Sequence, residues 1–175
     1  MILKLKRTPG IYIVGFMGCG KSTVGRALAD ELGWRFVDLD AEIEKAEGCP
    51  IAEIFEARGE AAFRLLEGAA LRSLVRKIEC GQPHVVALGG GAYVQDGNAG
   101  LLADKGVSLW LDCPFEMVQR RAEGDAGRPL ARDPEKFRAL YEERRAGYAR
   151  ADHRIEISGD DCIEVVKQIL ALGLV

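Results

Sequence analysis

The chain has 175 residues, of which 48% are hydrophobic and 29% are charged, and its formal net charge at pH 7 is -3. This composition is typical of a single globular domain and excludes a disordered or fibrous protein. A small negative charge creates no electrostatic field that attracts a polyanion. We therefore expect no nucleic-acid partner, and any bound phosphate must be held by a local site.

Cysteine usage and the first residues of the chain indicate the compartment. The five cysteines are an odd number without CxxC or metal-ligand spacing, which is typical of reduced thiols in the cytoplasm. The basic residues 1–7 precede an apolar run of only about six residues, too short for a signal peptide or a membrane span. We expect a cytoplasmic monomer without a membrane segment that acts on small molecules.

Apolar, strand-like runs alternate with helical segments along the chain. Strands are predicted in GIYIVG, WRFVDLD, HVVALGGG, GVSLWLD and HRIEI, and helices at residues 21–32, within 43–77, near Leu101, and at 114–121, 133–150 and 162–172. This alternation predicts an α/β fold with a five-stranded parallel sheet, covered by helices on both faces, and a ligand at the carboxyl ends of the strands. The helical block 43–77 and the polar stretch 123–133 look inserted, and each is a candidate mobile cover over a site.

A phosphate-binding loop follows the first strand. Residues 15–22, GFMGCGKS, match GxxxxGK[ST] between a strand and a helix, which is the context that supports the motif. Backbone N–H groups and the helix N-terminus bind phosphate, Lys21 reaches the β- and γ-phosphates, and the Ser22 hydroxyl binds Mg²⁺. The alternative is a glycine-rich turn capped by Ser22. The predicted nucleotide-binding residues are Gly15, Gly18, Cys19, Gly20, Lys21, Ser22 and Thr23.

The nucleotide predicted for this loop is ATP. A GTPase needs a base-reading pattern such as NKxD, and the one asparagine of the chain, Asn98, is followed by Ala99. A guanine-specific site is therefore excluded.

Two aspartates are expected at the end of the second strand. In FVDLD, Asp38 and Asp40 are two residues apart, so a strand points both carboxylates toward the phosphate loop. One can hold Mg²⁺ through water while the other orients or deprotonates an attacking hydroxyl. The alternative is that both cap the following helix. Asp112 is a competing candidate for the metal, but the nearby Pro114 favours a helix-start role for it.

Three further features stay ambiguous from the residues alone. Gly89–Gly91 follow the third strand and either offer free N–H groups to a small substrate or form a tight structural turn. Arg64 lies between two glutamates on a predicted helix, which is typical of an exposed face of salt bridges. Arg144 and Arg145 in YEERRAGY allow the same interpretation, so replacing Arg145 is expected to have a mild effect.

Taken together, these motifs resemble the shikimate kinase family. GFMGCGKSTVGRALA, FVDLDAEIE, IAEIFEARGEAAFRLLE, VALGGGAY, GRPL and YEERRAGYARAD occur in the order and spacing of that family, from about Ile11 to Asp152. Many kinases share the phosphate loop, whereas the combination of DxD, GExxFRxxE and GGG is much more specific. The resemblance implies phosphorylation of the 3-hydroxyl of shikimate by ATP and Mg²⁺, within the pathway to chorismate and the aromatic amino acids.

The resemblance also implies a fold and its subdivision. It implies a three-layer P-loop kinase fold like that of nucleoside monophosphate kinases, forming a single domain over residues 1–175. Its parts are a phosphate loop at 15–23, a substrate-binding insert at about 39–67 and a mobile lid at about 121–134. A related kinase such as a gluconate kinase, which lacks the FRxxE arginine, and a non-catalytic nucleotide-binding module are the alternatives.

The role of each site residue is likewise what the resemblance implies. Asp40 is the base on the attacking hydroxyl, and Asp38 is the water-mediated Mg²⁺ ligand beside Ser22. Arg64 and Arg144 are implied to bind the carboxylate of the substrate, a role that suits the forked, bidentate donors of a guanidinium group. The implied shikimate-binding residues are Asp40, Phe63, Arg64, Gly89, Gly90, Gly91 and Arg144, with Gly90 as a hydrogen-bond donor. Arg121 is implied to stack on adenine and Arg128 to close over the phosphates, so that Asp40, Lys21 and Arg128 form the catalytic set.

Overall fold

Strands and helices alternate in this computed structural model, which describes residues 10–123 and 133–175. The strands are β1 (Gly10–Val14), β2 (Arg35–Asp38), β3 (His84–Ala87), β4 (Val107–Asp112) and β5 (His153–Glu156). The helices are α1 (Lys21–Leu32), α2 (Leu39–Glu47), α3 (Ile51–Glu79), α4 (Asp96–Leu102), α5 (Phe115–Glu123), α6 (Pro134–Tyr148) and α7 (Cys162–Leu170). All five predicted strands are confirmed.

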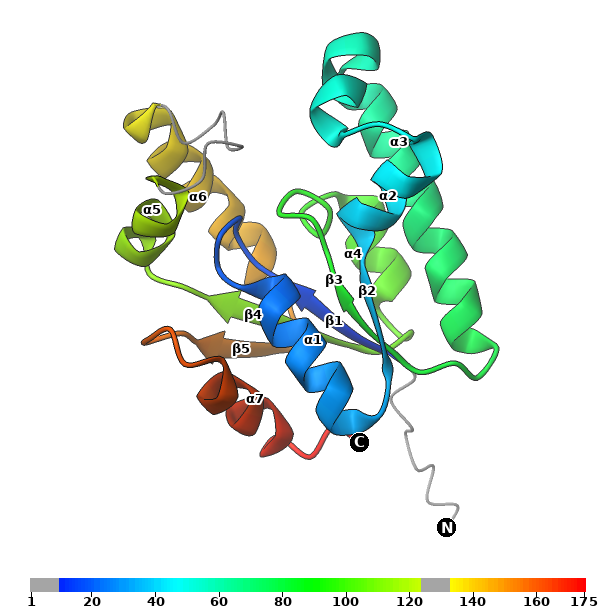
Figure 1. Cartoon of the computed structure of the whole chain (residues 1–175), viewed down its shortest axis with the longest axis vertical. Coiled ribbons are helices and arrows are strands. Elements are labelled where there is room, and N and C mark those ends of the chain that lie inside the picture. The colour runs from blue at the N-terminus through cyan, green and yellow to red at the C-terminus, as the bar shows by residue number, and fades with distance from the viewer. Residues whose placement is uncertain (1–9, 124–132) are drawn as a thin grey trace.

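The five strands form one parallel sheet in the order β2-β3-β1-β4-β5. Parallel neighbours need long crossovers, which the helices supply. Helices α1 and α7 pack together on one face, and α3, α4 and α6 cover the other (Figure 1). The predicted three-layer α/β architecture is therefore confirmed.

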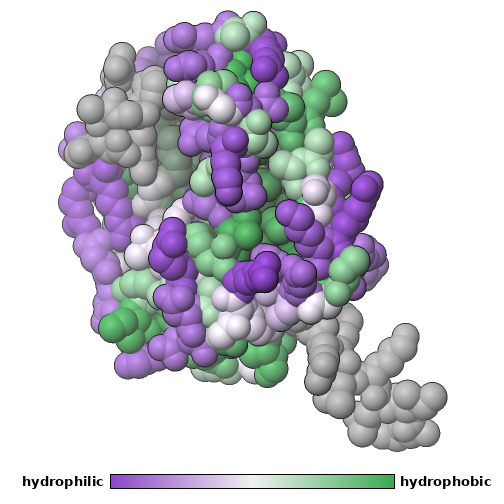
Figure 2. Space-filling model, turned by 45° about the vertical axis from the view of Figure 1, so that its right-hand side comes forward, coloured by the Kyte–Doolittle hydropathy of each residue, from purple (hydrophilic) through white to green (hydrophobic). Residues whose placement is uncertain are grey.

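Burial on both faces explains why the central strands read as continuous apolar runs. Every residue of β1 is buried, and Ile13 lies between Ala87 of β3 and Leu109 of β4. On the face seen in Figure 2, hydrophilic residues are mixed with hydrophobic ones, while the buried hydrophobic residues form one core cluster. The apolar side chains thus gather around the sheet and fix the carboxyl ends of its strands.

Glycine is required where the chain leaves β1. Gly15 has a φ of 145°, and a Cβ built there would lie 2.8 Å from the carbonyl oxygen of Leu111. Gly18 and Gly20 also have positive φ values, of 81° and 95°. L-residues with side chains avoid this conformation, so the glycine spacing of the phosphate loop is a backbone requirement.

The second strand is shorter than the sequence suggests. It ends at Asp38, and α2 begins at Leu39, so Asp40 lies in the first turn of a helix. The expectation that two-residue alternation along a strand points both carboxylates the same way is wrong. The Asp38 carboxylate accepts hydrogen bonds from the N–H groups of Asp40 and Ala41, and this N-cap starts the helix at Leu39, inside the predicted strand.

The predicted insert corresponds to α2 and the first half of α3. Gly59, with φ 78° and ψ 172°, interrupts the helical conformation inside α3 and bends it away from the sheet (Figure 1). The subdivision into core, insert and lid stays a prediction. Most of the predicted lid, including Arg128, lies outside the described residues. Within the described ranges, none of the helices has the length and apolar character needed to cross a membrane.

Candidate active site

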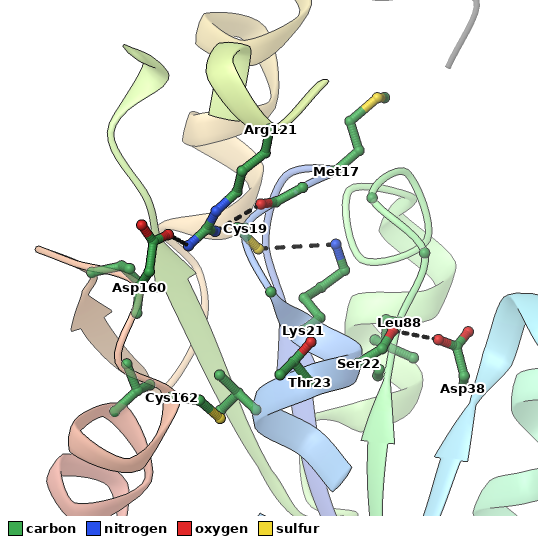
Figure 3. Close-up of a pocket in the computed structure, with 18 of the residues that line it drawn as sticks. Met17, Cys19, Lys21, Ser22, Thr23, Asp38, Leu88, Arg121, Asp160 and Cys162 are labelled. Carbon is green, nitrogen blue, oxygen red and sulfur yellow. Dashed lines mark hydrogen bonds and ion pairs between the residues drawn. The ribbon is translucent and has the colours of Figure 1, made fainter. Parts of the chain in front are cut away.

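A cavity of about 560 Å³ opens at the carboxyl edge of the sheet, above β1 and β3 (Figure 3). The phosphate loop forms its floor, and the segments after β2 and β3 form one wall. Residues from α5 and from the segment between β5 and α7 form the opposite wall. The position at the strand ends is the one that open parallel sheets use for ligands.

The phosphate loop is fully formed. The Lys21 Nζ donates hydrogen bonds of 3.0 Å to the carbonyl oxygens of both Gly15 and Phe16. The Ser22 hydroxyl donates to Asp38 Oδ2 over 2.5 Å, as Figure 3 shows. Lysine, serine and aspartate thus meet where a triphosphate and its cation bind in loops of this type.

The two oxygens of the Asp38 carboxylate have different partners, and one of them makes the helix cap that the sequence offered as an alternative. Its Oδ1 caps α2, and its Oδ2 faces Ser22 beside the cavity. One carboxylate therefore fixes the helix that carries Asp40 and also contributes an oxygen to the predicted metal site.

Asp40 is a buried carboxylate that lacks a full set of partners. Within the described residues, its Oδ1 is buried and accepts no hydrogen bond. Burial raises the pKa of Asp40, the charge of Asp38 adds to this, and the charge of Lys21 opposes it. Because an unsatisfied buried oxygen is costly, this atom is suited to accept a hydrogen bond from a ligand hydroxyl.

Three side chains from separate helices converge on the glycine turn after β3. A Cβ at Gly89 would lie 2.5 Å from Asp40 Oδ1 of α2, and one at Gly91 would lie 2.5 Å from Arg64 Nη2 of α3. A Cβ at Gly90 would lie 3.1 Å from Arg144 Nη1 of α6. Each glycine of the turn thus makes room for one predicted substrate-binding side chain.

Arg64 is held in place by carboxylates on its own helix. Its Nη1 donates to both oxygens of Glu67, at 3.1 and 2.9 Å, and its Nη2 donates to Glu60 at 3.2 Å. Glu67 is only 1% exposed, and burial raises the pKa of its carboxyl while Arg64 lowers it. The Nε of Arg64 is buried without a partner in the described part of the chain. The predicted salt-bridge pattern is present, but only Glu60 lies on the exposed surface, while Glu67 is buried and the Arg64 guanidinium faces the glycine turn.

Only some of the predicted substrate residues line the cavity itself. Asp40, Gly89 and Gly90 do, whereas Gly91, Arg64 and Arg144 do not, and the two arginines lie against the glycine turn. Phe63 is 4% exposed, with its ring centroid 4.7 Å from that of Phe55. It packs against Phe55 and does not line the cavity itself.

Comparison with known proteins identifies the family. The protein-family model described as shikimate kinase matches residues 17–172 of this chain. The chain belongs to the shikimate kinase family. A shikimate kinase from Persephonella marina is 44% identical over 161 residues, which cover 91% of this chain and 96% of that protein.

Solved structures agree with this assignment. The shikimate kinase from Acinetobacter baumannii, solved in complex with shikimate, matches with a TM-score of 0.87 and 38% identity, covering 97% of this chain and 94% of the other. A gluconokinase from Sinorhizobium meliloti is 19% identical with a TM-score of 0.58, covering 94% of this chain and 91% of the other. The latter likeness shows a common fold alone.

On the far wall of the cavity lies Arg121, whose stacking on adenine stays a prediction. It donates to the carbonyl oxygen of Gly18 at 2.9 Å and to Asp160 at 2.6 Å, so it joins the phosphate loop to the segment after β5. Sequence reasoning missed the lining residues of that segment and of the start of α7, namely Ile157, Gly159, Asp160, Asp161, Cys162 and Val165. The position of that segment at the carboxyl end of a strand was the available signal.

Asp112 neither caps a helix nor lines the cavity. Its carboxylate is 8% exposed and accepts two hydrogen bonds from Arg145 and one from Arg154 Nε at 2.8 Å. The helix-start role suggested by Pro114 is therefore wrong. Arg145 ties α6 to the end of β4, while its neighbour Arg144 faces the glycine turn.

Proposed function

We propose that the protein is a shikimate kinase, which transfers the γ-phosphoryl group of ATP to the 3-hydroxyl of shikimate. The product is shikimate 3-phosphate, on the pathway to chorismate and the aromatic amino acids. The observation that carries the proposal is the convergence of Asp40, Arg64 and Arg144 on one glycine turn beside the phosphate loop. Membership of the shikimate kinase family supports the same conclusion.

Shikimate is a small ring that carries one carboxylate and several hydroxyls, and the site offers matching groups. The guanidinium groups of Arg64 and Arg144 provide forked donors for the carboxylate. The unpaired Oδ1 of Asp40 accepts a hydrogen bond from a ring hydroxyl. Because the groups come from three helices, the ring is held at both ends and its 3-hydroxyl faces the phosphate loop.

Mg²⁺ fits the donor set at the loop. Ser22 Oγ and Asp38 Oδ2 are hard oxygen donors 2.5 Å apart, and Mg²⁺ prefers oxygen ligands, few of them from the protein. We propose that Ser22 binds the ion directly and Asp38 binds it through water. When bound, Mg²⁺ neutralises charge on the β- and γ-phosphates.

In the transfer step, the oxygen of the 3-hydroxyl forms a bond to the γ-phosphorus as the bond from this phosphorus to the bridging oxygen of ADP breaks. The carboxylate of Asp40 takes the proton of the hydroxyl. Lys21 releases the carbonyl oxygens of Gly15 and Phe16 and donates to the phosphates, where charge develops. Arg128 is proposed to add a second positive charge as the lid excludes water.

We further propose that the enzyme works as a cytoplasmic monomer without nucleic-acid or membrane partners. The small net charge of -3 favours the absence of a nucleic-acid partner. Light scattering of the purified protein tests the oligomeric state, and a mass of one chain is the expected result.

A coupled assay of ADP release tests the function. ADP is expected with ATP, Mg²⁺ and shikimate, but not with gluconate or with ATP alone. Activity on gluconate without activity on shikimate overturns the proposal. Binding of ATP with no transfer to either acceptor favours a non-catalytic nucleotide-binding module.

A further inference from the structure

Tyr148, the last residue of α6, joins two parts of the acceptor site. It is 1% exposed, and its hydroxyl donates a hydrogen bond to the carbonyl oxygen of Gly90. Arg144 lies one helical turn earlier and faces the same glycine: a Cβ built at Gly90 would lie 3.1 Å from Arg144 Nη1 and 3.7 Å from the Tyr148 hydroxyl. Burial raises the pKa of Tyr148. A tyrosine hydroxyl is protonated at neutral pH in any case, and the carbonyl oxygen of Gly90 can only accept, so Tyr148 is the donor.

The glycine turn needs an external anchor because three consecutive glycines leave the backbone unusually free. Each of its three carbonyl oxygens accepts one hydrogen bond. Gly89 accepts from the Ala92 N–H at 3.0 Å, and Gly91 accepts from Gln95 Nε2 at 3.3 Å. These two donors belong to the turn segment itself, whereas the Tyr148 hydroxyl at Gly90 comes from α6. Tyr148 is therefore the link that fixes the turn relative to the helix of Arg144.

This link also sets the direction of an N–H group. In a planar trans peptide, the carbonyl of Gly90 and the N–H of Gly91 point in opposite directions. The described residues contain no cis peptide, and within them the N–H groups of Gly89, Gly90 and Gly91 donate no hydrogen bond to backbone. Holding the Gly90 carbonyl on Tyr148 therefore directs the Gly91 N–H to the other side of the peptide and fixes the course of the turn at Gly90, which lines the cavity.

We propose that Tyr148 is a positioning residue for the acceptor, which acts through Gly90 and Arg144. Its hydroxyl aligns the free N–H groups of the turn with the guanidinium group of Arg144, so that both meet the substrate carboxylate in one geometry. The inference rests on the proposed shikimate kinase function. It assigns to Tyr148 an effect on acceptor binding but none on ATP binding.

Tyr12 offers a matched control for the loss of a buried hydroxyl. It is 0% exposed in β1, and its hydroxyl donates to the carbonyl oxygen of Lys105 at 3.3 Å. Lys105 precedes β4, at the opposite edge of the sheet from the cavity. Tyr12→Phe and Tyr148→Phe each remove one buried hydroxyl bonded to a carbonyl, but only Tyr148→Phe affects the glycine turn.

The test compares both variants with the wild type in the ADP-release assay and in thermal unfolding. Tyr148→Phe is expected to raise the KM for shikimate about five- to ten-fold and to leave the KM for ATP within about two-fold, as fits the loss of one hydrogen bond. Tyr12→Phe is expected to leave both KM values unchanged. Both variants are expected to lower Tm by similar amounts, because each loses one buried hydroxyl. If both variants have the wild-type KM for shikimate, the positioning role is wrong.

A second measurement separates this inference from the function on which it rests. If wild-type protein neither binds shikimate in calorimetry nor phosphorylates it, the proposed function itself fails. If it does both, the double variant Tyr148→Phe with Arg144→Lys decides how Tyr148 acts. Less than additive effects on the KM for shikimate are expected for residues that share one contact network, and fully additive effects contradict action through Arg144.

Discussion

The acceptor end and the nucleotide end of the cavity are built differently. At the acceptor end, Glu67 and Tyr148 are each 1% exposed and hold Arg64 and Gly90 in place. At the nucleotide end, the side chain of Asp160 that holds Arg121 is 65% exposed. The acceptor end is thus held by buried partners before any ligand binds, whereas the arginine at the nucleotide end is held by an exposed carboxylate. Binding of the acceptor depends on packing, and binding of the nucleotide depends on the loop and its charges.

The strongest way to test this contrast is at Lys21. Lys21→Ala removes the charge that donates to the phosphates, and kcat is expected to fall by about 10²- to 10³-fold. Lys105→Ala is the control, because Lys105 pairs with Glu79 away from the cavity. Steady-state kinetics measure both. A kcat for Lys21→Ala within two-fold of wild type would place the phosphates elsewhere.

Asp40→Asn tests the acceptor end with almost no change in shape. We expect kcat to fall by about 10²-fold or more, because the amide cannot take the proton of the hydroxyl. Asp30→Asn, on the exposed surface of α1, is the control and is expected to be silent.

Asp40→Asn also has an expected effect on stability. Burial raises the pKa of Asp40 in the folded state above its value in the unfolded chain. The contribution of Asp40 to folding stability is therefore fully present at a pH below the pKa of the unfolded state, and it is lost as the pH rises through the pKa of the folded state. At pH 7 the ionised carboxylate therefore costs stability, and the Tm of Asp40→Asn is not expected to fall. A near-normal rate for Asp40→Asn would remove Asp40 from the role of base.

Gly89→Ala tests the fixed geometry of the glycine turn. The added methyl group meets Asp40 Oδ1 at 2.5 Å, so either the carboxylate or the turn must move. Displacement by about an ångström is expected to lower kcat/KM for shikimate about 10²-fold, with the KM for ATP unchanged. Gly97→Ala in α4 is the matched control, since a Cβ there meets nothing within 4 Å. Equal activities of the two variants would mean that the acceptor end adapts freely.

The smallest effect on turnover is expected at Arg145, and the measurement there is stability. Arg145→Ala leaves the buried Asp112 with Arg154 alone, and the free energy of unfolding in urea is expected to fall by about 2 kcal/mol. The expectation of a mild effect, drawn from the sequence, is revised for stability. Arg138→Ala breaks an exposed pair with Glu116 and is expected to cost less than about 1 kcal/mol. Similar losses in both variants would show that burial of Asp112 is unimportant.

Features encoded in short stretches of sequence were predicted well. The strand, glycine loop and helix around Lys21 follow from local periodicity and backbone requirements, and the structure confirms them. Asp38 and Asp40 show the limit of such reasoning. Strand alternation and helix capping compete within the same five residues, and capping by Asp38 prevailed.

Contacts between distant segments were not predictable from local pattern. From the residues alone, Arg64 was predicted to form exposed salt bridges. Only the family resemblance indicated that Arg64 and Arg144 lie close together. The pairing of Asp112 with Arg145, the link from Tyr148 to Gly90 and the cavity wall after β5 all depend on how helices dock on the sheet. No periodicity within a single element contains that information.

The strand order has a consequence for how such enzymes diversify. Because β3 lies directly beside β1, the turn that meets the acceptor and the loop that meets the phosphates are spatial neighbours, yet they are separate stretches of chain. Evolution can therefore rebuild α2, α3 and α6 for a new alcohol while inheriting the phosphoryl-donating loop intact. A scaffold of this kind allows the repertoire of acceptors to widen without reinventing the chemistry.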